Sequence, residues 1–347
     1  LYQVATASLA PGSIAIPIRS VLARQGNARV VLGEAMEVDR EDRRLVLRDG
    51  TSLDYDWLVV ACGAKTSYFG RDEWAAHAHG MTDIRDAIRI RELVLLSFET
   101  AERDPDPESR QDKLTFVVIG GGPTGVETAG AICELGRQVL AGDYRNIAPD
   151  DIRVVLVEMG DRLLSGMDEE LSLDARHQLE ELGVEVRLET RVEDVGPASV
   201  LLADLARDGE KEALDAALVV WAAGVKPVSF AERLGVRLSK RGQVVVDDHC
   251  AAMGQPEIFA IGDVASFVPE GEEHALPGVA PVAIQQGQHV AKQIQRDLDR
   301  RPRSVFKYKD KGMMATVGRS RAVVQTDRMK LTGLMAWLAW GVVHIMF

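Results

Sequence analysis

Cysteine is scarce in this sequence, with 3 residues among 347. Cys62, Cys133 and Cys250 lie far apart and form no C-x-x-C pair, which excludes a redox-active disulfide between close neighbours. This usage fits a reducing compartment, and each cysteine is expected to be a small buried hydrophobe. The 7 histidines show no spacing typical of metal ligands, so no metal site is expected. No Ser, His and Asp arrangement typical of a hydrolase is recognisable.

Positive charge is also in short supply. The 41 Lys and Arg residues against 53 Asp and Glu give a net charge of −12, which argues against nucleic acid as a partner. The exception is residues 300–330, where ten Lys and Arg stand against two Asp, a local charge of +8. Directly after it, residues 331–347 carry no charge at all.

Long apolar runs are absent except at the end of the chain, so an array of membrane spans that could pump protons is not expected. As a helix, residues 331–347 would measure about 25 Å, just short of a bilayer core. An apolar helix beside a basic stretch is typical of a peripheral protein on an anionic membrane surface. The alternative is a helix buried in the core or in a homodimer interface.

The most informative segment is an apolar strand that runs into a G-x-G-x-x-G turn at residues 114–125. Gly120 permits the sharp turn, Gly122 lets the backbone approach a pyrophosphate, and Gly125 lets the next helix pack closely. Pro123 and Thr124 open that helix, expected to reach about residue 140. The unpaired N–H groups of its first turn would face an anion. This pattern predicts a dinucleotide site.

A second apolar strand, expected over residues 152–157, ends in Glu158. A carboxylate there accepts hydrogen bonds from the adenosine ribose and repels a 2′-phosphate, so NAD is expected in preference to NADP. Arg162 could instead attract a phosphate, which leaves NADP open. The alternative for the whole segment is an α/β layer that binds nothing.

The rest of the chain alternates strands and helices. Residues 28–61 predict short strands with a hairpin turn at Asp49–Gly50, and Thr82 is expected to cap a helix that reaches about residue 103. Residues 104–112 read as a loop at a domain boundary. Further helices are expected at 169–182 and 282–299, with strands near 184–202. This order of segments predicts that the glycine-turn unit is inserted into a second domain.

Several segments together resemble a known family: LYQVATA at 1, YDWLVVACGA at 55, IGGGPTGVETAG at 119, FAIGDVA at 259 and APVAIQQGQHVA at 280. They resemble the FAD-dependent pyridine nucleotide-disulfide oxidoreductases and, among these, the type II, non-pumping NADH:quinone oxidoreductases. The resemblance implies an α/β fold with two Rossmann-like dinucleotide-binding domains of three layers (β/β/α), the NAD domain inserted in the FAD domain. The implied parts are an FAD domain at 1–105 and 239–302, an NAD(H) domain at 106–238 and a membrane-associated region at 303–347.

The resemblance also implies where FAD lies. Gly262 and Asp263 end a strand, and the carboxylate would bind the ribityl chain of FAD, since ligands of open α/β sheets sit at the carboxyl ends of strands. The alternative is that Asp263 caps the following turn. The loop at Ala61 and Gly63 would lie beside the flavin. By the same resemblance, two residues of the AAGVKP segment would lie near the nicotinamide: Gly224 and Val225.

Four further residues receive roles from the resemblance alone. Glu127 would lie beside the nicotinamide and the quinone route, although a carboxylate in a first helical turn is favoured by the helix dipole whatever its function. Gln285 and Gln286 would lie near the quinone pocket, with a solvated Gln286 as the alternative. Lys311 resembles a lysine that approaches the flavin, and it reads equally well as a surface lysine.

The implied activity is transfer of hydride from NADH to FAD and of two electrons to a quinone, at the cytoplasmic face of the cell membrane. Family members begin with their own glycine-rich unit for the ADP half of FAD, and this sequence begins after it. We therefore expect a chain truncated at both ends that binds FAD weakly. Two other interpretations remain: a soluble NADH-dependent flavin reductase of another acceptor, and a non-catalytic NAD-binding sensor.

Overall fold

The computed structural model describes residues 1–346, with side chains described as far as residue 342, and its chain divides into two compact units. Unit 1 contains residues 1–16, 66–224 and the chain from 312 onwards, whereas unit 2 contains residues 17–65 and 225–311. Each unit is thus assembled from segments that are far apart in the sequence.

Unit 1 begins earlier than the boundary at 106 that the sequence suggested. The strand β6 (Ala78–Gly80) pairs in parallel with β13 (Leu218–Trp221), and Phe98 of helix α4 (Ile84–Glu102) packs in the same core as Phe116. Residues 66–105 therefore fold with the glycine turn. The expected loop at 104–112 contains instead a short helix, α5 (Pro107–Lys113), whose first turn is capped by Asp106.

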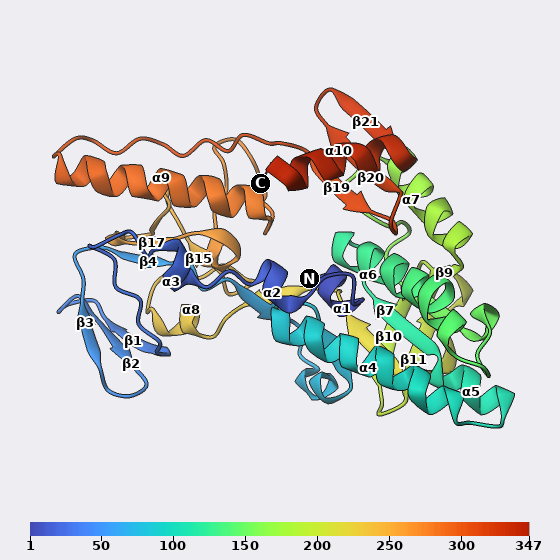
Figure 1. Ribbon diagram of the computed structural model, residues 1–347. Coiled ribbons are helices and arrows are strands. Elements are labelled where there is room, and N and C mark those ends of the chain that lie inside the picture. Colours follow the sequence, from blue (N-terminus) through green and yellow to red (C-terminus); the bar gives the residue numbers. More distant parts are fainter. Residues whose placement is uncertain (347) are drawn as a thin grey trace. The chain divides into compact units, whose positions relative to one another are not determined.

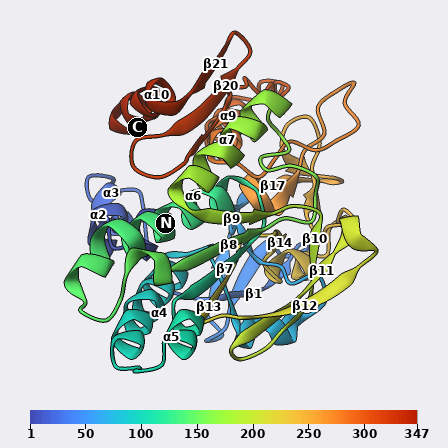
Figure 2. The same ribbon diagram turned by 90° about the vertical axis from the view of Figure 1, so that its right-hand side faces the viewer.

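The centre of unit 1 is a five-stranded parallel sheet in the order β6-β13-β7-β8-β9. Helices α4, α6 and α7 pack on one face, and an antiparallel three-stranded sheet, β10-β11-β12, covers the other (Figure 2). These layers agree with the expected β/β/α arrangement. The bounds are β7 (Thr115–Ile119), α6 (Pro123–Glu134), β8 (Arg153–Val157), α7 (Glu169–Leu182), β9 (Val184–Arg187), β10 (Thr190–Val195), β11 (Ser199–Asp204) and β12 (Glu210–Asp215).

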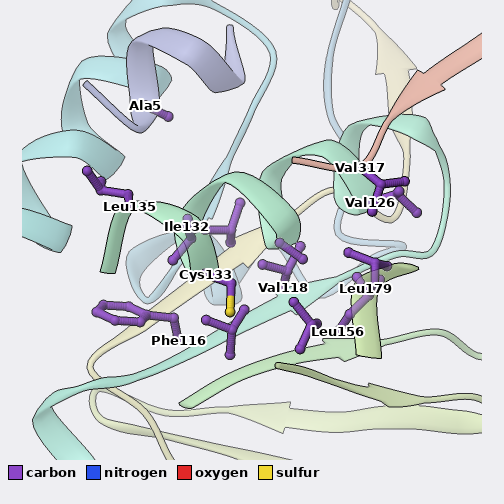
Figure 3. Close-up of a cluster of buried hydrophobic side chains, with 14 of the residues drawn as sticks. Ala5, Phe116, Val118, Val126, Ile132, Cys133, Leu135, Leu156, Leu179 and Val317 are labelled. Carbon is purple, nitrogen blue, oxygen red and sulfur yellow. The ribbon is translucent and has the colours of Figure 1, made fainter. Parts of the chain in front are cut away.

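Successive side chains of the central strands point to opposite faces of the sheet, so each of these strands contributes to the hydrophobic core on both faces. Phe116 and Val118 of β7 face the helices, whereas Val117 and Ile119 face the antiparallel sheet. On the helical side, Ile132 and Cys133 of α6 lie over the strands (Figure 3). Because both faces are covered, all five residues of β7 are buried, which explains its uninterrupted apolar sequence.

The start of α4 differs from expectation, whereas helical backbone after the glycine turn reaches the expected end near residue 140. Asp83, not Thr82, caps α4: its side chain accepts from the backbone N–H groups of Arg85 and Asp86, and Asp86 reciprocates in a capping box. Thr82 instead donates to the Asp86 carboxylate. Helix α6 ends at Glu134, and a π-helical turn at Leu135–Val139 continues it.

The last part of unit 1 is a hairpin sheet that the sequence did not predict, followed by a helix. Strands β19 (Met313–Thr316), β20 (Ala322–Thr326) and β21 (Met329–Thr332) pair antiparallel, and α10 (Gly333–Met346) lies over β20 and β21 (red, Figure 1). Residue 347, the end of the expected apolar segment, lies outside the described residues. No helix in the described part of the chain is long and apolar enough to cross a membrane.

Unit 2 holds smaller sheets. The antiparallel strands β1, β2 and β3 include the expected hairpin turn at Asp49–Gly50, but residues 28–34 form no strand. Strand β4 pairs in parallel with β17. The bounds are α3 (Ile18–Val21), β1 (Ala35–Asp39), β2 (Arg44–Leu47), β3 (Ser52–Asp54), β4 (Leu58–Val60), β14 (Val225–Pro227), α8 (Phe230–Arg233), β15 (Val244–Val245), β16 (Ala251–Ala252), β17 (Gln255–Ala260), β18 (Ala265–Ser266) and α9 (Ala280–Leu298).

Candidate dinucleotide-binding site

The three glycines of the turn after β7 meet different surroundings. A Cβ on Gly125 would lie 1.8 Å from the carbonyl oxygen of Gly120, and one on Gly120 would lie 2.7 Å from the backbone of Ala222. Gly120 also has a φ of +112°. A Cβ on Gly122 would meet nothing within 4 Å. Packing therefore demands the outer glycines, while the space at Gly122 is free for a ligand.

The first turn of α6 presents unsatisfied backbone donors. Gly122 is the N-cap residue, and no side chain caps the helix. Pro123 and Thr124, the first two helical residues, are exposed. Open N–H groups at the start of a helix of this length favour an anion, through direct hydrogen bonds and through the helix dipole. This end of α6 fits a pyrophosphate group.

The carboxylate of Glu158 is held beside this turn at the end of β8. Its Oε2 accepts from the N–H of Gly121 at 2.5 Å, and its Oε1 accepts from the N–H of Gly160 at 2.7 Å. A carboxylate oxygen has two lone pairs, so each oxygen can still accept from a ribose hydroxyl. Arg162, considered above as a phosphate ligand, donates to the carbonyl oxygen of Ser165 at 3.1 Å.

A cleft of about 530 Å³ joins these groups along the carboxyl edge of the sheet. Strands β13, β7 and β8 are neighbours, so Gly224, the glycine turn and Glu158 follow one another along this edge. The opposite wall is aromatic and was missed from the sequence. Tyr68 and Trp74 pack against Trp221 with centroid distances of 5.3 and 5.4 Å. Gly70, a residue type that favours turns, is the signal that could have drawn attention to this segment.

Glu127 lies in α6, half-buried, facing β19 rather than solvent. The N–H of Thr316 approaches its Oε1 at 3.3 Å. Burial raises the pKa of Glu127 to about 7, a shift that this hydrogen bond from Thr316 opposes. The carboxyl group is therefore poised to gain or lose a proton near neutral pH. A second buried carboxyl group on the same helix, that of Glu134, accepts from the N–H of Arg319 at 3.0 Å.

In unit 2, two neighbouring parallel strands end at one edge. The loop that contains Ala61 and Gly63 follows β4, and Gly262 and Asp263 follow β17. Gly63 and Gly262 both have a φ of +68°. A Cβ on Gly278 would lie 2.9 Å from the carboxylate of Asp263, so a larger residue there would displace this carboxylate. No described side chain hydrogen-bonds this carboxylate, which suits a hydroxyl-rich ligand.

The remaining expected site residues fall into different places. Gln286 is 1% exposed and accepts from the N–H of Gly262 at 2.7 Å, so a solvated Gln286 was the wrong alternative. Gln285 exchanges two hydrogen bonds with the backbone of Lys309. Lys311 is an exposed residue of unit 2. Val225, 56% exposed, also belongs to unit 2 and does not line the cleft. No cluster of described His, Cys, Asp or Glu residues could hold a metal ion.

Comparison with known proteins places this architecture in a class. The sequence profile of the pyridine nucleotide-disulphide oxidoreductase family matches residues 1–287. The chain therefore belongs to this family, whose members bind FAD and NAD(H).

Within the family the chain is a homologue of the type II NADH:quinone oxidoreductases. It is 39% identical to the type II NADH:quinone oxidoreductase NdhA of Mycobacterium tuberculosis, over 100% of this chain and 75% of that protein. It is 32% identical to the type II NADH:quinone oxidoreductase of Staphylococcus aureus, over 92% of this chain and 77% of that protein. Among solved structures, NDH2 from Plasmodium falciparum in complex with NADH has the same fold, with a TM-score of 0.89 and 21% identity over 99% of this chain and 86% of that one.

Proposed function

We propose that this protein oxidises NADH and reduces a quinone without pumping protons. The observation that carries the proposal is the complete dinucleotide cradle of unit 1 in a chain 39% identical over its whole length to a type II NADH:quinone oxidoreductase. When bound, FAD supplies the redox chemistry between the two substrates. The overall exchange balances as NADH, one proton and quinone giving NAD⁺ and quinol.

Unit 1 is the NAD(H)-binding domain in this proposal. The first turn of α6 receives the pyrophosphate above Gly122, and the Glu158 carboxylate accepts the ribose hydroxyls. The same carboxylate repels a 2′-phosphate, so NADH binds in preference to NADPH. Glu158→Arg is expected to move the ratio of NADPH to NADH affinity upward, about tenfold or more for a full reversal of charge. An unchanged ratio would remove Glu158 from this role.

Unit 2 is the FAD domain. The carboxylate of Asp263 is the acceptor for a hydroxyl of the ribityl chain, while Ala61, Gly63 and Gly262 supply backbone that lies close to the cofactor. Gln286 fits a positioning role, because its amide holds the N–H of Gly262. Gln285 likewise ties α9 to the backbone at Lys309. Roles for Lys311 near the flavin and for Val225 near the nicotinamide rest on the family resemblance.

Glu127 is the candidate proton carrier. Quinone reduction consumes two protons, and a carboxyl group whose pKa is about 7 is half protonated at neutral pH. Its placement in the helix that begins at the dinucleotide cradle supports a role close to the reaction. In this proposal Glu127 delivers a proton to the reduced quinone and regains one from solvent.

The helix α10 is the proposed membrane contact, at the cytoplasmic face and on an anionic leaflet. Ala336 is buried against the β20–β21 hairpin, whereas Leu334, Met335, Leu338 and Val342 are 48–64% exposed. An exposed apolar stripe of this kind inserts into a membrane interface.

The basic stretch is divided between the two units, because residues 300–311 belong to unit 2 and residues 319–330 to unit 1. Several of its charges are paired, among them Arg303 with Asp297, Arg321 with Glu181 and Lys330 with Asp168. Electrostatic attraction to the membrane is therefore weaker than the count of +8 implies, and the apolar stripe of α10 carries most of the contact.

The central test is a steady-state assay of NADH oxidation by the protein with FAD added. Oxidation that depends on added quinone supports the proposal. NADH oxidation that proceeds with a soluble acceptor, at a rate that added quinone does not change, favours a flavin reductase of another acceptor. NADH binding without turnover, in protein that has retained FAD, favours the non-catalytic sensor.

Membrane attachment is tested by liposome flotation with anionic vesicles. The double change Leu334→Glu and Leu338→Glu is expected to abolish flotation, because two charges would have to enter the interface. Leu173→Glu is the matched control, since Leu173 is a 54% exposed leucine on α7. Wild-type protein that stays in the aqueous fraction and elutes as a dimer would favour a homodimer interface on α10 instead.

A further inference from the structure

An aromatic residue occupies an unfavourable position in the turn at residues 68–71. The N–H of Arg71 donates to the carbonyl oxygen of Tyr68 at 3.0 Å, and the two central residues, Phe69 and Gly70, have φ values of +51° and +91°. Positive φ at both central positions defines a type I′ turn, which favours Asn, Asp or Gly at the first of them. A bulky side chain in this conformation is strained.

The surroundings hold this turn firmly. The hydroxyl of Tyr68 donates to the carbonyl oxygen of Ala78 at 2.7 Å. The indole N–H of Trp221 donates to the carbonyl oxygen of Ser67 at 2.8 Å. The N–H of Ser67 donates to the carbonyl oxygen of Gly224 at 3.0 Å. These contacts fix the chain that leads into the turn, and Arg71 at its other end pairs with the carboxylate of Asp194 at 3.1 Å. The strained conformation is therefore imposed from both sides of Phe69.

Burial of the Phe69 ring does not explain the strain, because this ring is 70% exposed. It lines the dinucleotide cleft and lies 6.4 Å from Trp221, centroid to centroid. Its tip lies so close to Gly224 that a Cβ there would be 2.8 Å from the Cζ of Phe69. The turn thus presents an apolar ring to the cleft at the end of β13.

The strand order identifies the part of the ligand that lies there. Glu158 follows β8, the glycine turn follows β7, and Gly224 follows β13, so the ribose, pyrophosphate and distal sites succeed one another along the sheet edge. A dinucleotide with its adenosine at Glu158 and its phosphates at Gly122 extends its nicotinamide half toward Gly224 and Phe69.

We propose that Phe69 is a ligand-contacting residue that packs against the nicotinamide half of the bound dinucleotide and keeps water from it. This inference rests on the proposed function, since it takes NAD(H) as the ligand of the cleft. The type I′ turn places the ring, and the exposed face of the ring becomes buried when the ligand arrives. An apolar wall beside the nicotinamide favours a neutral ring over water.

The test compares two ligands on three variants of the full chain by calorimetry. NADH carries the nicotinamide half, and ADP-ribose lacks the nicotinamide. Phe69→Asn removes the ring and installs a residue that the turn prefers, Phe69→Leu removes the aromatic ring but retains apolar bulk, and Phe69→Tyr retains the ring. We expect Phe69→Asn to weaken NADH binding about tenfold and to leave ADP-ribose binding unchanged, with Phe69→Tyr close to wild type.

Thermal unfolding supplies a second readout. If Phe69 had only a structural role, Phe69→Asn would lower the melting temperature. Relief of strain predicts an equal or higher melting temperature for Phe69→Asn despite its weaker NADH binding. Equal losses for NADH and ADP-ribose, no loss for either, or a Phe69→Tyr variant as weak as Phe69→Asn would each overturn the inference. If Phe69→Asn fails to fold, Phe69→Leu decides by the same criterion. Failure of the proposed function is distinct, because wild-type protein would then bind neither ligand.

Discussion

The two units present ligand edges built on the same principle, but by different means. In unit 1 the outer two glycines of the turn after β7, Gly120 and Gly125, are required by packing, because a Cβ on Gly125 would collide with the backbone of Gly120. In unit 2 a Cβ on Gly63 would meet nothing within 4 Å, and its φ of +68° alone favours glycine. One edge is set by close contact between chain segments and the other by local backbone conformation.

The carboxylates at the two edges also differ, in their hydrogen-bond partners. Glu158 has both oxygens occupied by backbone N–H groups of the protein, whereas no described side chain hydrogen-bonds the carboxylate of Asp263. The dinucleotide edge of unit 1 is therefore organised before a ligand arrives. At the edge of unit 2 no described side chain holds the carboxylate in this way. The carboxylate of unit 1 therefore has a structural role that the carboxylate of unit 2 lacks.

The largest expected effect separates the two kinds of glycine. Gly125→Ala forces a methyl group to within 1.8 Å of a carbonyl oxygen, so we expect a loss of about 3 kcal/mol or more in unfolding free energy. Gly63→Ala, which adds only backbone strain, should lose about 1 kcal/mol. Urea unfolding followed by tryptophan fluorescence measures both. Equal losses would mean that packing does not distinguish the two edges.

Gly122→Ala separates binding from stability within unit 1. A Cβ there meets nothing, and Gly122 has a φ of −74°, which alanine adopts freely, so the unfolding free energy should stay within about 0.5 kcal/mol of wild type. The methyl group would occupy the space above the helix start. We expect NADH affinity, measured by calorimetry, to fall by about 10- to 100-fold. Unaltered affinity would show that the pyrophosphate does not approach Gly122.

The carboxylates provide a third comparison. Glu158→Gln replaces a charged acceptor of two backbone N–H groups, so it should lower the unfolding free energy by about 1–2 kcal/mol. Asp263→Asn should change it by less than about 0.5 kcal/mol. Both are measured by urea unfolding without ligand. A larger loss for Asp263→Asn than for Glu158→Gln would reverse the interpretation of the two edges.

An effect about as large as that of Glu158→Gln is a pH dependence that arises from Glu127. Because burial raises its pKa from 4.5 to about 7, the folded state binds more protons than the unfolded state between these values. Its contribution to stability is therefore fully present below pH 4.5 and is lost as the pH rises through 7. The unfolding free energy of the wild type therefore decreases between pH 5 and pH 8. We expect this decrease to be about 1–2 kcal/mol smaller in Glu127→Gln. Parallel pH profiles for wild type and variant would contradict the shifted pKa.

Much of the local structure of the candidate dinucleotide site was predictable because it is continuous in the sequence. The apolar strand, the glycine turn and the start of α6 follow one another without interruption, and helix α7 occupies the expected residues 169–182. Prediction failed at one helix cap and at one expected strand. Asp83 caps α4 in place of Thr82 because its side chain meets two backbone N–H groups, and residues 28–34 form no strand although their composition favours one.

The order and chemical type of the residues were sufficient to predict the strand, turn and helix of the candidate cradle at Gly120 to Glu158. Propensities for these structures depend on a few neighbouring residues. Long-range pairing settled the rest. Glu127 meets Thr316 across 189 residues, and Phe69 reaches the cleft because β6 and β13 bring residues 66–80 beside Trp221. Such long-range contacts depend on which surfaces pack together when the whole chain folds, so they cannot be predicted from a short stretch of sequence.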